Sequence, residues 1–175
     1  MKRSIRHIIF DWGDTLMHDD STKESPMYQW EIVREVECAR NVLNELSRLY
    51  ELSVATNAEQ SNEQMVLKAL NRVEMDKHIQ RVFTSRAVGK KKNEREFWIS
   101  VSNQLEAKAE EILVVGDSFQ SDVMTPTSAG MQALWYNSRS GEKKEGMRYR
   151  TIHNLSEITN EAEQISAGNA DKLRA

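Results

Sequence analysis

Short runs rich in β-branched residues alternate along this chain with longer stretches in which apolar residues recur every three or four positions. The short runs predict strands over residues 5–10, 52–55, 81–84, 112–115, 133–136 and 150–152. The longer stretches predict helices over about residues 29–50, 61–70, 93–105 and 119–129, and a last one from about residue 156. Such alternation favours an α/β fold, with a parallel sheet covered by helices on both faces.

The length of 175 residues suits one domain around a single core. We expect that domain to span residues 1–161, followed by a polar, frayed tail over residues 162–175. The lone Cys38 provides no intrachain disulfide, and the apolar run Ile8–Phe10 is too short for a signal peptide or a membrane span. These two features lead us to expect a cytoplasmic protein without membrane partners. A net charge of -3 does not favour nucleic-acid binding, so we expect no nucleic-acid partner either.

Polar residues of particular types follow four of the predicted strands. The carboxyl ends of parallel strands meet at one edge of the sheet, where open α/β folds bind ligands. Carboxylates bind Mg²⁺, whereas an ammonium and a hydroxyl group bind phosphate oxygens. The residues predicted to meet at this edge are Asp11, Thr56, Asn57, Lys92, Asp117 and Asp122.

Four segments surround these residues: FDWGDTL at residues 10–16, VATN at 54–57, GKKK at 89–92 with Phe97 and Trp98 after it, and VGDSFQSDV at 115–123. In this order, and at predicted strand ends, they resemble the four motifs of the haloacid dehalogenase (HAD) superfamily of phosphohydrolases. The continuation SAGM at residues 128–131 is also typical of that family. The resemblance covers residues 5–136 and implies a Rossmann-like HAD-type core.

The resemblance also implies a mechanism. Asp11 would attack the phosphorus of a phosphorylated substrate and form an aspartyl-phosphate, which is covalent catalysis by a carboxylate. Thr56 and Asn57 would bind the phosphoryl group, and Lys92 would pair with both the nucleophile and the phosphate. The resemblance implies a Mg²⁺ site made by Asp11, the backbone carbonyl of Gly13, Asp117 and Asp122.

The first motif departs from the family pattern at Gly13. Family phosphatases carry there a second aspartate, which protonates the leaving group and then activates water. Asp14 is one residue further along, and on an extended segment its side chain would point to the opposite side. General acid–base catalysis is typically worth ~10²–10⁴ in rate, so poor leaving groups should suffer most from this change.

This departure leaves alternatives to a phosphatase. One is a weakly active or inactive module that binds phosphate or a partner. Another is a 2-haloacid dehalogenase, whose halide leaves without a proton, although Asp117 and Asp122 would then have no evident use. A plain nucleotide-binding Rossmann protein is disfavoured, because no glycine-rich loop follows the first strand.

A large cap domain does not fit into the chain. The predicted helices and strands use nearly all residues between Asp11 and Thr56 and between Thr56 and Lys92, which leaves only a small flap over about residues 17–28. The resemblance then implies an open site that accepts a large substrate or borrows a neighbouring subunit as its cap. We expect His18 to be exposed on the flap, Lys90 and Lys91 to be surface charges, and Trp98 and Trp135 to lie in the core.

Overall fold

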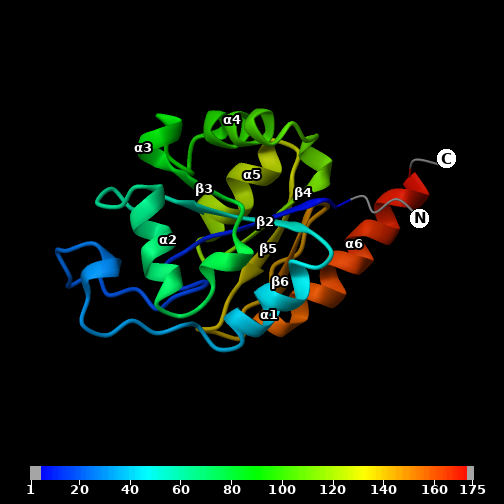
Figure 1. Cartoon of the computed structure of the whole chain (residues 1–175). Helices are drawn as coiled ribbons and strands as arrows, with labels where there is room; N and C mark the ends of the chain where they lie inside the picture. Colours follow the sequence, from blue (N-terminus) through cyan, green and yellow to red (C-terminus); the bar gives the residue numbers. More distant parts are fainter. Residues whose placement is uncertain (1–4, 173–175) are drawn as a thin grey trace.

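The computed structural model describes residues 5–172 and contains a six-stranded parallel sheet (Figure 1). Each predicted strand is confirmed to within two residues, and the order across the sheet is β3-β2-β1-β4-β5-β6. The α/β fold without a large cap is therefore as predicted. The strands are β1 (His7–Phe10), β2 (Glu51–Thr56), β3 (Arg81–Thr84), β4 (Ile112–Gly116), β5 (Gln132–Tyr136) and β6 (Tyr149–Ile152).

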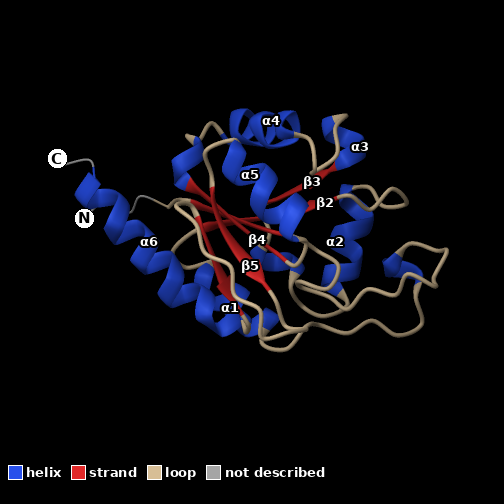
Figure 2. Cartoon of the chain, turned by 180° about the vertical axis from the view of Figure 1, so that it is seen from behind, coloured by secondary structure: helices blue, strands red, loops and turns tan. Residues whose placement is uncertain are grey.

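Helices cover both faces of the sheet (Figures 1 and 2). One face packs against α1 (Ala39–Leu46), α2 (Glu63–Asn71) and α6 (Ile158–Lys172), and the other against α4 (Arg95–Leu105). Successive side chains of β1 show why both faces are apolar: Ile8 and Phe10 join the α1–α2–α6 core, while Ile9 packs with Phe97 and Trp98 of α4. This is the two-residue periodicity of a strand that is buried on both sides.

The strand register brings the carboxyl ends of three strands to one edge. Phe10, the last residue of β1, is paired with Val54 of β2 and with Val115 of β4. From β1 the chain builds outward through β2 and β3, and it then returns to place β4 on the other side of β1. The β1–β4 pair is therefore the topological switch point, where open sheets form a crevice for ligands.

The long helix predicted over residues 29–50 is wrong in its first half. Only Ala39–Leu46 is α-helical, and the apolar side chain of Ile32, within the predicted helix, is 71% exposed. The backbone of this stretch pairs with the flap instead: Val36 N–H donates to Leu16 at 2.9 Å and His18 N–H donates to Arg34 at 3.0 Å. Tertiary pairing has displaced the helix that the apolar spacing favoured.

Two other predicted helices differ in detail. The helix predicted over 119–129 is divided into a π-helix, Phe119–Met124, and the short α5, Thr125–Ser128. The segment predicted to be a polar tail continues α6 to Lys172, while residues 173–175 lie outside the described residues. No described helix has the length and apolar character needed to cross a membrane. The remaining short helices are α3 (Ser85–Val88) and the 3-10 turns Met27–Gln29, Asp76–His78, Ala109–Glu111 and Leu155–Glu157.

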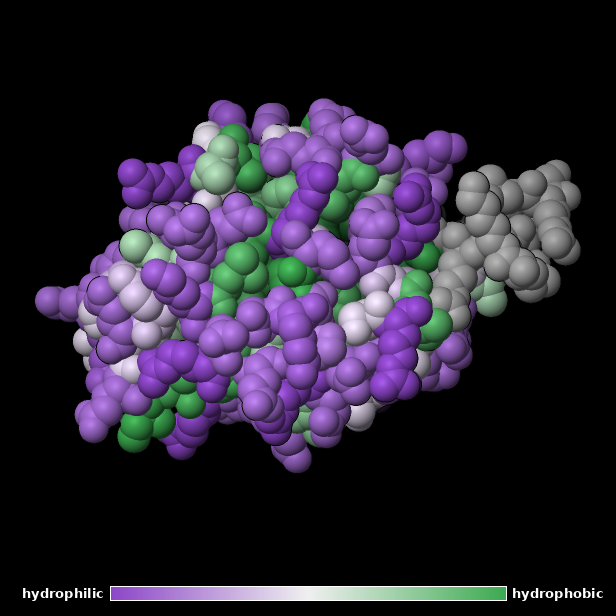
Figure 3. Space-filling view, in the orientation of Figure 1, coloured by the Kyte–Doolittle hydropathy of each residue, from purple (hydrophilic) through white to green (hydrophobic). Residues whose placement is uncertain are grey.

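The face of the molecule seen in Figure 1 is predominantly hydrophilic, with most apolar side chains in furrows between polar ones and one group protruding at the lower left edge (Figure 3). This agrees with the charged fraction of 29%, and the buried hydrophobic residues form two large cores and a smaller cluster of Val123, Ala133 and Trp135.

His7 at the start of β1 is a buried polar residue in this core. Its Nδ1 lies 3.5 Å from the Glu51 carboxylate, and among the described residues neither ring nitrogen has a hydrogen-bond partner. Burial lowers the pKa of His7 below its ordinary 6.5, and Glu51 opposes this only in part. The unfolded chain therefore binds a proton more readily than the folded one.

We expect this difference to destabilise the fold as the pH falls through 6.5, because protonation then favours the unfolded state. The melting temperature of the His7→Leu variant should fall less than that of the wild type between pH 7.5 and pH 5. Parallel thermal melts of both proteins measure this. Equal pH profiles would show that His7 stays unprotonated, or equally protonated, in both states.

Candidate active site

The site is centred on Asp11, the residue that directly follows β1. Its backbone N–H donates to the carbonyl of Val115 at 2.8 Å, which continues the β1–β4 pairing by one residue. Its carboxylate accepts a weaker hydrogen bond from the Thr15 hydroxyl at 3.3 Å. The nucleophile predicted from the sequence is thus fixed at the switch point of the sheet.

Lys92 reaches this carboxylate from the loop between α3 and α4. Its ammonium donates to Asp11 and, at 2.7 Å, to Asp122, and its side chain is only 4% exposed. Burial by itself would lower the pKa of Lys92, but the two carboxylates raise it above its ordinary value. The lysine is therefore a permanent positive charge between two acids.

The backbone around Lys92 is held as firmly as its ammonium. Its N–H donates to the side-chain oxygen of Asn57 at 2.9 Å, and its carbonyl accepts from the Trp98 indole at 2.8 Å. The indole is completely buried, as expected, but it also orients the lysine. Lys90 and Lys91 are exposed and pair with Glu94 and Glu59, which agrees with their prediction as surface charges.

Asp122 lies on the π-helix after β4 and is fully buried. Its second oxygen accepts from the Ser118 N–H at 3.0 Å. Burial raises the pKa of Asp122 to about 7, although Lys92 acts in the opposite direction. The Asp122 carboxylate can lie here only because residue 116 is a glycine: a Cβ atom at Gly116 would be 2.3 Å from that carboxylate.

Asp117 completes a group of three carboxylates with Asp11 and Asp122. One oxygen from each of these lies within 4.8 Å of the others. Burial, together with the neighbouring Asp11, raises the pKa of Asp117 to about 6, and Arg139 at 3.6 Å opposes the rise. Three carboxylates and one ammonium leave an excess of negative charge. Carboxylate oxygens are also the ligands that a hard divalent cation prefers.

Thr56 ends β2 beside this cluster. It is buried, and its hydroxyl oxygen accepts from the Ala58 N–H at 3.0 Å, so it fixes the turn that follows the strand. The next helix, α2, is capped by Asn62, whose side chain accepts from the Met65 N–H. Capping of that helix is thus left to Asn62, and Thr56 and Asn57 remain at the site.

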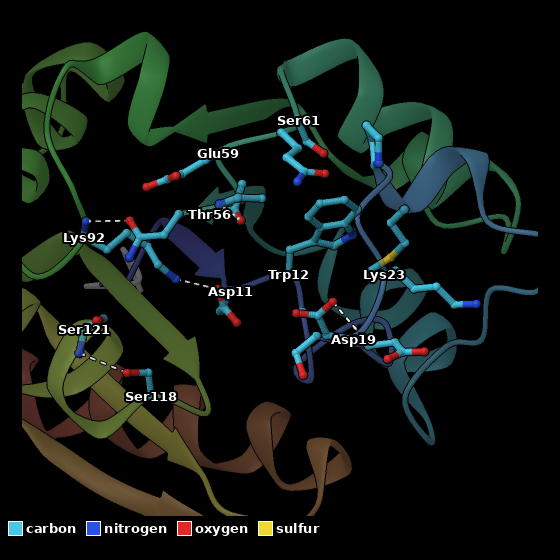
Figure 4. Close-up of a pocket in the computed structure, with 18 of the residues that line it drawn as sticks. Asp11, Trp12, Asp19, Lys23, Thr56, Glu59, Ser61, Lys92, Ser118 and Ser121 are labelled. Atoms are coloured by element: carbon cyan, nitrogen blue, oxygen red, sulfur yellow. Dashed lines mark hydrogen bonds and ion pairs between the residues drawn. The ribbon is translucent and has the colours of Figure 1, made fainter.

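A pocket of about 520 Å³ opens over the cluster (Figure 4). Most of the predicted site residues line this pocket. Asp117 is not part of the lining, but its carboxylate lies close to those of Asp11 and Asp122, which are. The outer wall of the pocket is the irregular segment over residues 19–30, which overlaps the small flap predicted over about residues 17–28. The predicted residues in the lining are Asp11, Gly13, Thr56, Asn57, Lys92 and Asp122.

The wall is anchored to the domain by Arg72, which follows α2. Its guanidinium donates to the backbone carbonyls of Tyr28, Trp30 and Glu31, at 2.9 Å for the last of these. The Trp30 indole in turn donates to the Ser25 carbonyl at 2.7 Å. Sequence reasoning gave no role to Arg72, because a side chain that binds backbone carbonyls 40 residues away leaves no local pattern.

Comparison with known proteins identifies the family. Residues 8–136 match the family model described as haloacid dehalogenase-like hydrolase. The chain belongs to this family. No curated protein matches this HAD-like hydrolase significantly.

Solved structures share its fold at low sequence identity. The putative HAD-hydrolase YfnB from Bacillus subtilis, bound to magnesium, is 16% identical with a TM-score of 0.73, over 92% of this chain and 99% of the other. A HAD phosphatase from Thermococcus onnurineus is 16% identical with a TM-score of 0.69, over 89% and 97%. A 2-haloacid dehalogenase from Pseudomonas syringae pv. Tomato is 15% identical with the same TM-score and coverage. These likenesses support the HAD-like fold and leave the reaction open.

Removing the buried ammonium from this HAD-like hydrolase should destabilise it strongly. The Lys92→Met variant leaves Asp122 buried beside Asp11 without a cation, and we expect a loss of about 3 kcal/mol in the free energy of unfolding at pH 8. The loss should shrink as the pH falls to 5, because an unpaired buried carboxylate has a raised pKa and gains stability on protonation. Urea denaturation at both pH values measures this.

The double variant Lys92→Met/Asp122→Asn is the matched control, since it removes the stranded charge together with the ammonium. It should recover part of the stability at pH 8 and show little dependence on pH. An equal loss in both variants would mean that packing of the lysine side chain, and not its charge, supports the site.

Proposed function

We propose that this HAD-like hydrolase is a phosphatase that cleaves phosphate monoesters through an aspartyl-phosphate on Asp11. The observation that carries the proposal is the contact between the Asp11 carboxylate and the buried Lys92 ammonium at the floor of a pocket. A carboxylate and a phosphate dianion repel each other, and an ammonium between them offsets that repulsion before attack.

The residues of the chain divide the work. One oxygen of Asp11 attacks phosphorus, the bond from phosphorus to the leaving oxygen breaks, and the phosphoryl group is transferred to the carboxylate. Lys92 remains protonated and donates to the phosphoryl oxygens, with Thr56 and Asn57 beside it in the pocket lining. Asp122 holds Lys92 in place. Water then hydrolyses the aspartyl-phosphate and releases phosphate.

A magnesium ion fits this donor set. Asp11, Asp117 and the Gly13 carbonyl would hold it, with Asp122 adding charge from behind, because both Asp122 oxygens are already bonded to Lys92 and Ser118. When bound, it would neutralise negative charge on the phosphoryl group. The raised pKa values of Asp117 and Asp122 support this, since burial, and after it the charge of Asp11, disfavours the ionised carboxylates, and a bound cation would offset both effects.

The pocket favours a small phosphorylated molecule as the substrate. A volume of about 520 Å³ lies in the range of small-molecule sites, and the wall over residues 19–30 narrows an approach that we expected to be open to a large partner. Met27 and Trp30 offer apolar contact for the leaving group, and Lys23 offers a positive charge at the rim.

Hydrolysis of an aryl phosphate by the purified protein tests the proposal. We expect turnover that requires Mg²⁺, is abolished by a chelator and returns when Mg²⁺ is added again. The Asp11→Asn variant, which keeps the size of the side chain, should lose activity by about 10³-fold or more, because the nucleophile is gone.

Turnover no greater than that of Asp11→Asn would contradict the proposal. Mg²⁺-dependent binding of inorganic phosphate, measured by calorimetry in the absence of turnover, would then favour the phosphate-binding module. Halide release from a 2-haloacid would favour the dehalogenase, a reaction that gives Asp117 and Asp122 no evident task.

A further inference from the structure

The space beside Gly13 is occupied by the carboxylate of another residue. A Cβ atom at Gly13 would lie 3.1 Å from Oδ2 and 3.3 Å from Cγ of Asp19. Asp19 is on the wall of the pocket, and Asp11 lies in the lining of the same pocket. In Figure 4 their carboxylates border one opening and point toward each other across it. An acid is therefore present where the first motif lacks one.

Asp19 is held in this position by its neighbours. Its backbone N–H donates to the Asp14 carboxylate at 3.0 Å, and its Oδ1 accepts from the Asp20 N–H at 2.8 Å. Within the part of the chain that the structure describes, Oδ2 has no hydrogen-bond partner. The oxygen that faces Gly13 is thus the one left available to a ligand.

Two other titratable residues near Gly13, Asp14 and His18, do not face the pocket. Asp14 has left-handed backbone geometry, with φ of 57°, and its carboxylate binds Arg139 at 2.7 Å as well as the Asp19 N–H. His18 is exposed, as predicted, and neither residue belongs to the pocket lining. Asp14 therefore positions Asp19 and does not face the substrate.

We propose that Asp19 is the general acid and base of the reaction, supplied by the pocket wall in place of a residue at position 13. This rests on the proposed phosphatase function. As Asp11 attacks, the bond from phosphorus to the leaving oxygen breaks, and that oxygen takes its electron pair and a proton from the Asp19 carboxyl to become an alcohol. The Asp19 carboxylate then takes a proton from water as the water oxygen attacks phosphorus. The bond from phosphorus to Asp11 breaks and phosphate leaves, so that Asp11 is regenerated as a carboxylate and Asp19 as a carboxylic acid.

The test is a series of phenyl phosphates whose leaving phenols differ in acidity, measured with Mg²⁺ in wild type and Asp19→Asn. The value of kcat/KM reports the steps up to phenol release, and poor leaving groups depend most on a proton donor. We expect Asp19→Asn to lower kcat/KM by about 10²-fold for unsubstituted phenyl phosphate and by less than about 3-fold for a dinitrophenyl phosphate.

Two further variants separate catalysis from structure. Glu24→Gln, on the same wall but outside the pocket lining, should behave as wild type. The double variant Gly13→Asp/Asp19→Gly moves the carboxylate to position 13, where the space vacated by Asp19 admits it, and should recover most of the loss for phenyl phosphate. Because this readout is a recovery, it stands even where Asp19→Asn lowers the melting temperature.

A uniform loss across the series in Asp19→Asn, without recovery in the double variant, would overturn the assignment of Asp19 while leaving the phosphatase intact. Absence of Asp11-dependent turnover in the wild type would instead contradict the phosphatase and, with it, this role of Asp19.

Discussion

The buried ammonium of Lys92 is the constraint on which the site depends. Without this ammonium, the neighbouring carboxylates of Asp11 and Asp122 could not both stay ionised away from water. Without these carboxylates, a lysine as buried as Lys92 could not stay charged. The surrounding structure serves that contact: Asn57 and Trp98 fix the lysine backbone, and the sheet register fixes Asp11. The fold thus maintains a charged group in a place where hydrophobic packing alone would exclude it.

The sequence predicts the sheet and the residues at its edge because both follow from short-range rules. Apolar runs mark buried strands, and the carboxyl ends of parallel strands lie at one edge of the sheet whatever the conformation of the loops between them. The helix predicted over residues 29–50 is wrong in its first half because a long-range contact decides the structure there. The apolar spacing is helical, yet residues 34–36 pair with residues 16–18, and no local pattern indicates such a partner. The roles of Arg72 and Arg139 were not predicted either, since each binds residues that only the folded chain brings near it.

Within the family pattern, the chain differs at Gly13, and the structure gives that difference a physical setting. Asp11, the proposed nucleophile, directly follows a strand that is hydrogen-bonded on both sides, whereas Asp19 lies on a segment with few regular backbone hydrogen bonds. Asp14, through its left-handed backbone and its contact with Arg139, links this segment to the loop after β5. The two proposed roles, attack and proton transfer, thereby fall on parts of the molecule that differ in backbone hydrogen bonding.

The two attachments of the pocket wall have an evolutionary consequence. The wall is joined to the domain at the pairing of residues 16–18 with 34–36 and at the Arg72 guanidinium, and the chain between these points forms no strand of the sheet. Insertions and exchanges between the attachments would leave the register of β1 and β4 unchanged. A lineage could therefore explore new leaving groups by exchanges in the exposed wall residues 21–25, which leave Asp19 and the buried Met27 in place.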